Sequence, residues 1–224
     1  MNDKIQQKDI NNAAWAACDT FRGAVDPAQY KDYILGFIFY KYLSDKLERF
    51  AISQDFSKED IQNLSERDEQ TVNFFKDNLG YFIIHDHLFS TWLDLAGDFQ
   101  VSDVREALSA FSRLIHPDHK SLFDGIFKTL ETGFSKLGDT AQKQTKAISE
   151  LIQLIKDIPM DGRQDYDVLG FIYEYLISMF AANAGKKAGE FYTPHEVSVL
   201  MSEIIADHVK GKDKIDIYDS TSGS

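Results

Sequence analysis

One long stretch of helix-forming residues constrains the fold of this chain more than any other feature. It runs from residue 26 to residue 50, DPAQYKDYILGFIFYKYLSDKLERF, and Gly36 is its only glycine. Asp26 is placed to cap the helix, and Pro27 suits its first turn, where the missing N–H is not needed. Apolar side chains then recur at helical spacing, with Lys41 at the edge of their row: Tyr30, Ile34, Phe37, Ile38 and Tyr42. A helix with such a face needs other helices to cover it.

Residues 1–160 predict a succession of further helices. Most begin near a Ser, Thr or Asp, whose side chains accept hydrogen bonds from the first free N–H groups of a helix. Only GYFII and the region after Pro117 suggest short extended pieces. The sequence therefore predicts a mainly α chain that starts with a helical N-terminal domain. Its further predicted helices are INNAAWAACDTFRGAV, SKEDIQNLSERDEQTVNFFKDNL, HLFSTWLDLAG, SDVREALSAFSRLI and TAQKQTKAISELIQLIKDI.

The pattern changes at DIPMDGRQDYD, where proline, glycine and aspartate residues predict a domain boundary. Beyond it, residues 165–185 are apolar nearly all round and predict a buried helix. KIDIYD is expected to form a strand that delivers Asp219 into STSGS. Helix, strand and glycine turn in this order predict that residues 161–224 open an α/β, Rossmann-like domain. Between the buried helix and the strand, a second helix has a full set of signals: Thr193 as N-cap, Pro194 at the first position, Glu196 completing a capping box and Gly211 just past the end.

Charge and composition exclude several kinds of function. The formal net charge is −12, and the basic residues are scattered, so the chain does not resemble a module that reads DNA by itself. If DNA is bound, we expect another part of the protein or another subunit to supply most of the DNA contacts. No apolar run is long enough to cross a bilayer and the N-terminus has no signal-peptide layout, so we expect a cytoplasmic protein without membrane contact. Cys18 is the only cysteine, which excludes an internal disulfide.

Two histidine clusters, HPDH at 116–119 and HDH at 85–87, could suggest a metal site. Pro117 prevents a helix from presenting both rings of the first cluster on one face, and no further ligands with zinc spacing accompany either one. We therefore expect no metal. Ser222 and Ser224 lack the G-x-S-x-G elbow of a nucleophilic serine.

The segment GEFYTPHE, residues 189–196, is the strongest candidate for ligand binding. Phe191 and Tyr192 stand directly before a capped helix N-terminus, whose free N–H groups favour an anionic group. Gly223 follows the predicted strand, at the place where α/β sheets bind ligands, although such turns also occur without ligands. Together these features suit a ligand with a flat ring and a charged tail. Neither G-x-G-x-x-G nor the Walker loop G-x-x-x-x-G-K-[ST] occurs in the chain.

Three segments in order resemble the modification subunits of type I restriction-modification systems, which are N6-adenine DNA methyltransferases. AGEFYTPHEVSVLM followed by IYDSTSGS is similar to the two cofactor-binding motifs of that family, F-Y-T-P and D-P-x-x-G-S-G. AAWAACDTFRGAVDPAQYKDYILGFIFYKYLSDKL resembles its helical N-terminal domain, and DVLGFIYEYLISMFAANAGKKAGEFYTP resembles its linking helix. The resemblance covers most of the chain.

The resemblance implies S-adenosylmethionine as the cofactor. Ser220 stands where the family usually has a proline, a departure that loosens the turn without abolishing it. The family's catalytic motif N-P-P-[FY] does not occur in the 224 residues, so no catalytic residue is assigned. We expect an N-terminal fragment that is inactive alone. The implied cofactor pocket is formed by Glu190, Phe191, Tyr192, Thr193, Pro194, His195, Asp219, Ser222, Gly223 and Ser224.

For the whole protein the resemblance implies direct methyl transfer to N6 of an adenine rotated out of the duplex. The implied partners are DNA, bound through the assembled complex, a specificity subunit that recognises the target, a second modification subunit and, in some systems, a restriction subunit. A different hypothesis is a helical interaction module attached to another α/β domain, such as a dinucleotide-dependent oxidoreductase. The sequence after Ser224 distinguishes the two, since N-P-P-[FY] favours methylation and G-x-G-x-x-G favours the oxidoreductase.

Overall fold

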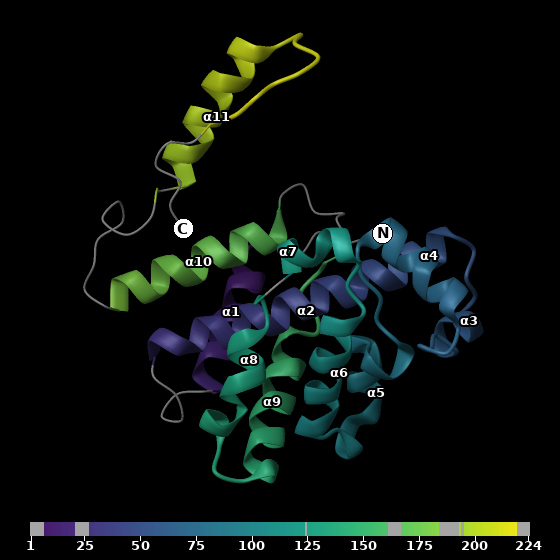
Figure 1. Ribbon diagram of the computed structural model, residues 1–224. Coiled ribbons are helices and arrows are strands. Elements are labelled where there is room, and N and C mark those ends of the chain that lie inside the picture. Colours follow the sequence, from purple (N-terminus) through teal and green to yellow (C-terminus); the bar gives the residue numbers. More distant parts are fainter. Residues whose placement is uncertain are drawn as a thin grey trace. The chain divides into compact units, whose positions relative to one another are not determined.

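The computed structural model describes residues 7–20, 27–123, 125–160, 167–183, 193 and 195–218. The chain divides into two compact units, Met1–Ile172 and Tyr173–Ser224. The described residues are almost entirely helical (Figure 1), which confirms the mainly α fold class. Within these residues β pairing is limited to one isolated antiparallel bridge, between Tyr81 and Ile115.

The first unit consists of helices joined by short connections and single 3-10 turns. The α-helices are α1 (Gln7–Thr20), α2 (Pro27–Ser53), α3 (Lys58–Gln62), α4 (Glu69–Leu79), α5 (Phe89–Leu95), α6 (Val101–Arg113), α7 (Lys120–Phe123), α8 (Lys128–Gly133) and α9 (Ala141–Ile155). The 3-10 turns are η1 (His85–His87), η2 (Ala96–Asp98), η3 (Pro117–His119) and η4 (Phe134–Leu137).

Helix α2 is the centre of this unit and extends across it (Figure 1). It begins at Pro27, as predicted, and continues for 27 residues. The predicted apolar row is buried at Ile34, Phe37 and Ile38, and the helix packs against α1, α5, α8 and α9. Burial of these side chains removes a large apolar area from water, which is the main stabilising contribution to the fold.

An aromatic cluster fills the space between α2, α5 and α6. The ring of Tyr40 stacks on that of Trp92, with centroids 4.8 Å apart and planes 10° from parallel. Phe111 meets Tyr40 edge-on at 6.3 Å. The Tyr40 hydroxyl donates a hydrogen bond of 3.0 Å to the carbonyl of His87, so its polar end is satisfied inside the core. Burial raises the pKa of Tyr40 far above its ordinary value, so this hydroxyl stays protonated.

Two glycines allow α2 and α8 to approach closely. A Cβ on Gly36 would lie 2.9 Å from Cδ1 of Leu130, and a Cβ on Gly133 would lie 2.8 Å from Cζ of Tyr33. The Tyr33 hydroxyl also donates a buried hydrogen bond of 2.9 Å to the Gly133 carbonyl. A Cβ at either position would displace the side chain that packs on it, Leu130 or Tyr33.

The predicted helix over residues 57–79 is two helices, α3 and α4. Ser57 forms a capping box with Asp60 at the start of α3. Asp68 then starts a new helix, because its carboxylate accepts a hydrogen bond of 3.2 Å from the N–H of Thr71. Helix α4 ends at Gly80, whose left-handed φ of 88° turns the chain into the predicted extended piece GYFII, where the bridge to Ile115 forms.

The expectation of an extended piece after Pro117 is wrong. Pro117 opens the 3-10 turn η3, and α7 follows directly. The ring nitrogen Nδ1 of His116 accepts a hydrogen bond of 3.2 Å from the N–H of Asp118 and so caps this turn. A proline in the first turn favours a helix start, and here that preference decides the local structure.

Helix α10 (Val168–Asn183) spans the division between the units, and α11 (His195–Val209) lies in the second unit. Asp167 caps α10 by accepting a hydrogen bond of 3.1 Å from the N–H of Gly170. Gly211 follows α11 with a left-handed φ of 81°, as its position predicted. The strand expected at KIDIYD is not formed over residues 214–218, because the described part of the chain offers it no neighbouring strand to pair with.

Candidate functional site

Most of the predicted cofactor-binding residues lie outside the described residues: Glu190, Phe191, Tyr192, Pro194, Asp219, Ser222, Gly223 and Ser224. The two that remain are adjacent to the start of α11. Thr193 is exposed, and His195 is the first residue of the helix. The predicted helix N-terminus therefore exists at the predicted place, directly after the aromatic pair in the sequence. The first N–H groups of an α-helix lack partners within the helix, so they suit an anionic group.

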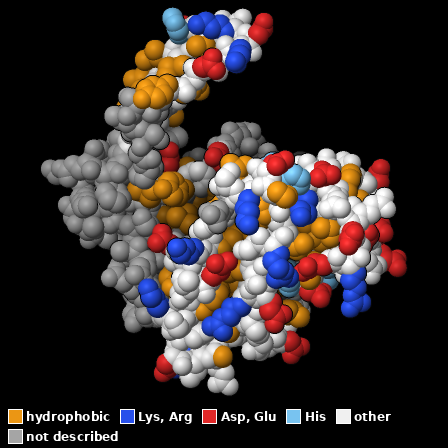
Figure 2. Space-filling view, viewed as in Figure 1, with side chains coloured by type: hydrophobic (Ala, Val, Ile, Leu, Met, Phe, Trp, Pro, Cys, Tyr) orange, Lys and Arg blue, Asp and Glu red, His pale blue; other side chains and the backbone are white. Residues whose placement is uncertain are grey.

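Helix α11 carries a stripe of five apolar side chains along one side, and this stripe is exposed. Its five members are between 44% and 62% exposed in this structure: Val197, Leu200, Met201, Ile204 and Ile205. Figure 2 shows these hydrophobic side chains gathered along the helix. Ile217 and Tyr218 are 86% and 90% exposed, so the segment that should form the first strand is also uncovered. A helix with such a face has the pattern of one that packs on a sheet.

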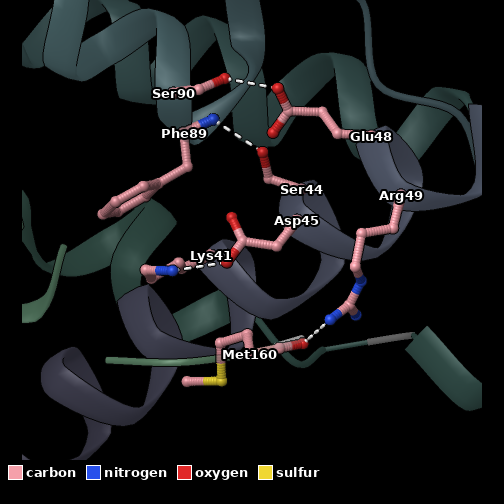
Figure 3. Close-up of polar contacts among 8 residues, drawn as sticks. All are labelled: Lys41, Ser44, Asp45, Glu48, Arg49, Phe89, Ser90 and Met160. Carbon is pink, nitrogen blue, oxygen red and sulfur yellow. Dashed lines mark hydrogen bonds and ion pairs between the residues drawn. The ribbon is translucent and has the colours of Figure 1, made fainter. Parts of the chain in front are cut away.

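A polar stripe on α2, formed by Lys41, Asp45 and Arg49, was not predicted as a functional feature (Figure 3). These residues are spaced four apart and so lie on one side of the helix. Lys41 is only 5% exposed and pairs with Asp45. Its ammonium group also lies 5.6 Å from the ring centroid of Phe89. Nη1 of Arg49 donates to the carbonyl of Met160, which lies 111 positions later in the chain.

Two further polar residues of α2, Ser44 and Glu48, form hydrogen bonds with the first two residues of α5. The Ser44 hydroxyl oxygen accepts a hydrogen bond of 2.8 Å from the N–H of Phe89, the first residue of α5. The Ser90 hydroxyl donates to Glu48 over 2.9 Å. Burial raises the pKa of Glu48, and the hydrogen bond from Ser90 opposes part of that rise. Ser44 therefore supplies the acceptor that the N-cap residue of α5, Leu88, does not, and Glu48 bonds to the side chain of the second residue of α5.

The histidine cluster at 116–119 contributes to the packing around α4 and η3. His116 lies 3.6 Å from Asp77 and 3.8 Å from Asp118, and the His119 ring packs over Gly80. No group of three or more His, Cys, Asp or Glu side chains in the described part of the chain is arranged to hold a metal ion.

A hollow of about 350 Å³ lies between η1 and α6. Burial lowers the pKa of His87, which lines it. Nη2 of Arg105 donates to Gln144 over 2.9 Å, and Nη2 of Arg113 donates to Glu66 over 3.1 Å. Because both guanidinium groups already have partners, this hollow offers little free positive charge to an anion.

Comparison with known families gives two matches that together span most of the chain. Residues 10–155 match the HsdM N-terminal domain, and residues 164–224 match the N-6 DNA Methylase family. A match to the HsdM N-terminal domain followed by a match to the N-6 DNA Methylase family defines the class of protein. This chain belongs to the family of type I restriction enzyme methylase subunits, as its three resembling segments predicted. The alternative of a dinucleotide-dependent oxidoreductase is not supported.

Individual relatives agree with the family. The chain is 29% identical to the type I restriction enzyme MpnII methylase subunit of Mycoplasma pneumoniae over 98% of this chain and 43% of the relative. It is 25% identical to the MjaIX methylase subunit of Methanocaldococcus jannaschii, over 96% of this chain and 38% of that one. The crystal structure of a type I restriction-modification methyltransferase subunit from Streptococcus thermophilus is similar with a TM-score of 0.72 and 29% identity, over 93% of this chain and 45% of that one. The chain thus spans less than half of the length of these relatives.

Among the described residues, no helix combines the length and the apolar character needed to cross a bilayer.

Proposed function

We propose that this chain is the N-terminal part of a modification subunit whose complete form transfers a methyl group from S-adenosylmethionine to N6 of adenine in DNA. The observation that carries the proposal is the order of the two family matches in one chain. The N-6 DNA Methylase match over residues 164–224 includes both GEFYTPHE and DSTSGS, and it comes after the helical-domain match, which ends at residue 155.

The proposed cofactor pocket consists of the residues of these two motifs. Phe191 and Tyr192 would hold the flat adenine ring by stacking. The N-terminus of α11, with Thr193 and His195, would face the carboxylate of the methionine part. Asp219 and Gly223 would line the pocket from the second motif, together with Glu190, Pro194, Ser222 and Ser224. When bound, the cofactor supplies an activated methyl group on a sulfonium centre.

The start of α11 supports this assignment. The helix begins at His195, three residues after the proposed aromatic pair ends at Tyr192, and Thr193, between the pair and the helix, is exposed. The apolar stripe of α11 would cover one face of the parallel sheet that the rest of the methyltransferase domain contributes. The boundary of that domain with the helical domain is proposed near residue 160, giving domains over 1–160 and 161–224.

The proposed partners follow from the family and from the charge of the chain. Acidic and basic side chains are interspersed over the face of the first unit seen in Figure 2, and the net charge is −12. A surface of this kind gives weak attraction to a phosphate backbone. We therefore place target recognition in a specificity subunit, with DNA bound by the assembled complex in the cytoplasm. The proposed complex also contains a second modification subunit and, in some systems, a restriction subunit.

The decisive experiment combines gene sequence and activity. The gene is sequenced past codon 224, and the longer product is assembled with a specificity subunit. Incorporation of labelled methyl groups at adenine N6 is then measured with Tyr192→Ala and with the matched control Tyr173→Ala. Tyr173 is a partly exposed tyrosine outside both motifs.

The proposal expects N-P-P-[FY] in the longer frame, a raised KM for S-adenosylmethionine in Tyr192→Ala, and ordinary kinetics in Tyr173→Ala. The 224-residue chain alone should bind the cofactor weakly and methylate nothing. Tight stoichiometric binding by the short chain, or a longer frame with G-x-G-x-x-G and no N-P-P-[FY], would contradict the proposal.

A further inference from the structure

Residues 156–160, here called the connector segment, follow α9 and lie on the polar side of α2. Ile158 and Met160 are buried, and the N–H of Ile158 donates a hydrogen bond of 3.1 Å to the carbonyl of Ile155. The segment is therefore packed onto the helical domain, although it has no regular secondary structure beyond the turn at its start.

The contact between α2 and the connector segment is polar and specific. Arg49 is the last member of the polar stripe, and its guanidinium group donates to the carbonyl of Met160, the last residue of the connector segment (Figure 3). The bond is partly buried, and a charged donor forms one of the stronger hydrogen bonds in proteins. Lys41 and Asp45 satisfy each other further along the stripe.

A hollow of about 410 Å³ lies between the polar side of α2 and the connector segment, and residues 156–160 all line it. Cationic and anionic groups line it in equal measure, with Lys41, Arg49 and Lys156 facing Asp45, Glu48 and Asp157. This balance favours neither an anionic nor a cationic ligand. We therefore interpret the hollow as the solvent-exposed edge of the contact between the connector segment and α2, and not as a binding pocket.

The connector segment has a particular place in the chain. It lies between the HsdM N-terminal domain match, which ends at residue 155, and the N-6 DNA Methylase match, which begins at residue 164. The segment therefore directly follows the first family match and still lies within the first unit, which continues to Ile172.

We propose that Arg49 is the anchor of the connector segment, and that its hydrogen bond to Met160 keeps the path between the two domains fixed on α2. The anchoring itself needs neither cofactor nor DNA. Its value for methyl transfer, a defined starting point for the cofactor-binding domain, rests on the proposed function.

The two methionines Met160 and Met201 provide the test. Met160 is buried beneath the anchor, whereas Met201 on α11 is more than half exposed, so peroxide should oxidise Met201 first. The 224-residue chain is treated with dilute hydrogen peroxide, and the oxidation rate of each methionine is followed by peptide mass spectrometry. Hydrogen exchange of the connector segment and of α6 is measured on the same samples.

Three variants distinguish loss of the hydrogen bond from Arg49 to Met160 from a general loss of stability. Arg49→Leu removes the donor, Arg49→Lys keeps a cationic donor, and Arg67→Leu removes an exposed arginine elsewhere as the matched control. We expect Arg49→Leu to oxidise Met160 about tenfold faster relative to Met201, as the loss of one charged hydrogen bond implies. Arg49→Lys should keep most of the protection, and Arg67→Leu should keep all of it. Exchange in α6 should remain unchanged throughout.

An unchanged Met160 rate in Arg49→Leu would overturn the proposal. So would a rise that is matched by faster exchange in α6, because this would mean general loosening, or a rise in Arg49→Lys equal to that in Arg49→Leu. The assay contains neither S-adenosylmethionine nor DNA, so its failure would leave the proposed methyl transfer untouched.

Discussion

Replacing Gly133 by alanine tests the close approach of α8 to α2. The new Cβ would lie 2.8 Å from Cζ of Tyr33 and nearer still to its hydroxyl oxygen, so the tyrosine ring would have to move. Tyr33 is fully buried, and its hydrogen bond to the Gly133 carbonyl would be lost as it moved. The backbone at Gly133 has φ −105° and ψ −6°, which alanine adopts without strain, so the clash with the side chain decides the result.

The magnitude follows from three contributions. Overpacking of a core costs about 1–3 kcal/mol, and loss of a buried hydrogen bond costs about 1 kcal/mol. Alanine is more favourable than glycine in a helix by up to about 1 kcal/mol, which offsets part of these two costs. We therefore expect the free energy of unfolding to fall by about 2 kcal/mol, which for a chain of this size lowers Tm by about 4–8 °C.

The assay is urea denaturation followed by tryptophan fluorescence, since both tryptophans, Trp15 and Trp92, lie in the first unit. The control is Gly97→Ala, because a Cβ at Gly97 meets nothing within 4 Å. Tyr33→Phe added to Gly133→Ala should recover part of the loss by removing the hydroxyl that clashes. If Gly133→Ala and Gly97→Ala both unfold at the same urea concentration as the natural sequence, the inference that α8 lies close against α2 at Gly133 is wrong.

Three other predictions concern the polar residues around α2 and η1. Ser44→Ala should lower the free energy of unfolding by about 1–2 kcal/mol, as measured by urea denaturation, because the first N–H of α5 loses its acceptor. The pKa of Glu48 is raised in the fold, so its charge opposes folding once the pH exceeds the unfolded value of 4.5. Glu48→Gln, which can still accept from Ser90, should therefore raise Tm at pH 7 and leave it unchanged below about pH 4. The pKa of His87 is lowered from 6.5, so its contribution to stability is complete above that pH and is lost as the pH falls below it; His87→Gln should flatten this part of a Tm–pH curve.

Local signals in the sequence located most of the helices. Pro27 starts α2, Thr140 caps α9 by accepting from the N–H of Lys143, and Gly211 follows α11 in a left-handed conformation. Each of these is a preference of one residue for one backbone position, so it can be read without knowing the rest of the fold.

Features that depend on distant contacts could not be found in this way. Helix α8 was not predicted, because Gly133 is an unfavourable helix residue that is required only by the ring of Tyr33, 100 positions away. The polar stripe of Lys41, Asp45 and Arg49 was visible as a four-residue spacing, but Lys41 was interpreted as the edge of the apolar row. Its role depends on Met160, which no local pattern connects to α2. The cofactor pocket remains a prediction, since most of its residues lie outside the described part of the chain.

The central position of α2 has a consequence for synthesis on the ribosome. The helix is complete at Ser53, but α9, which packs on it, ends about a hundred residues later, at Ile155. At about 5–20 residues per second, the apolar face of α2 waits roughly 5–20 s for its last partner to emerge. During that interval it resembles the exposed surfaces that chaperones bind. Growth temperature and translation rate should therefore affect the soluble yield of this protein more strongly than its final stability would suggest.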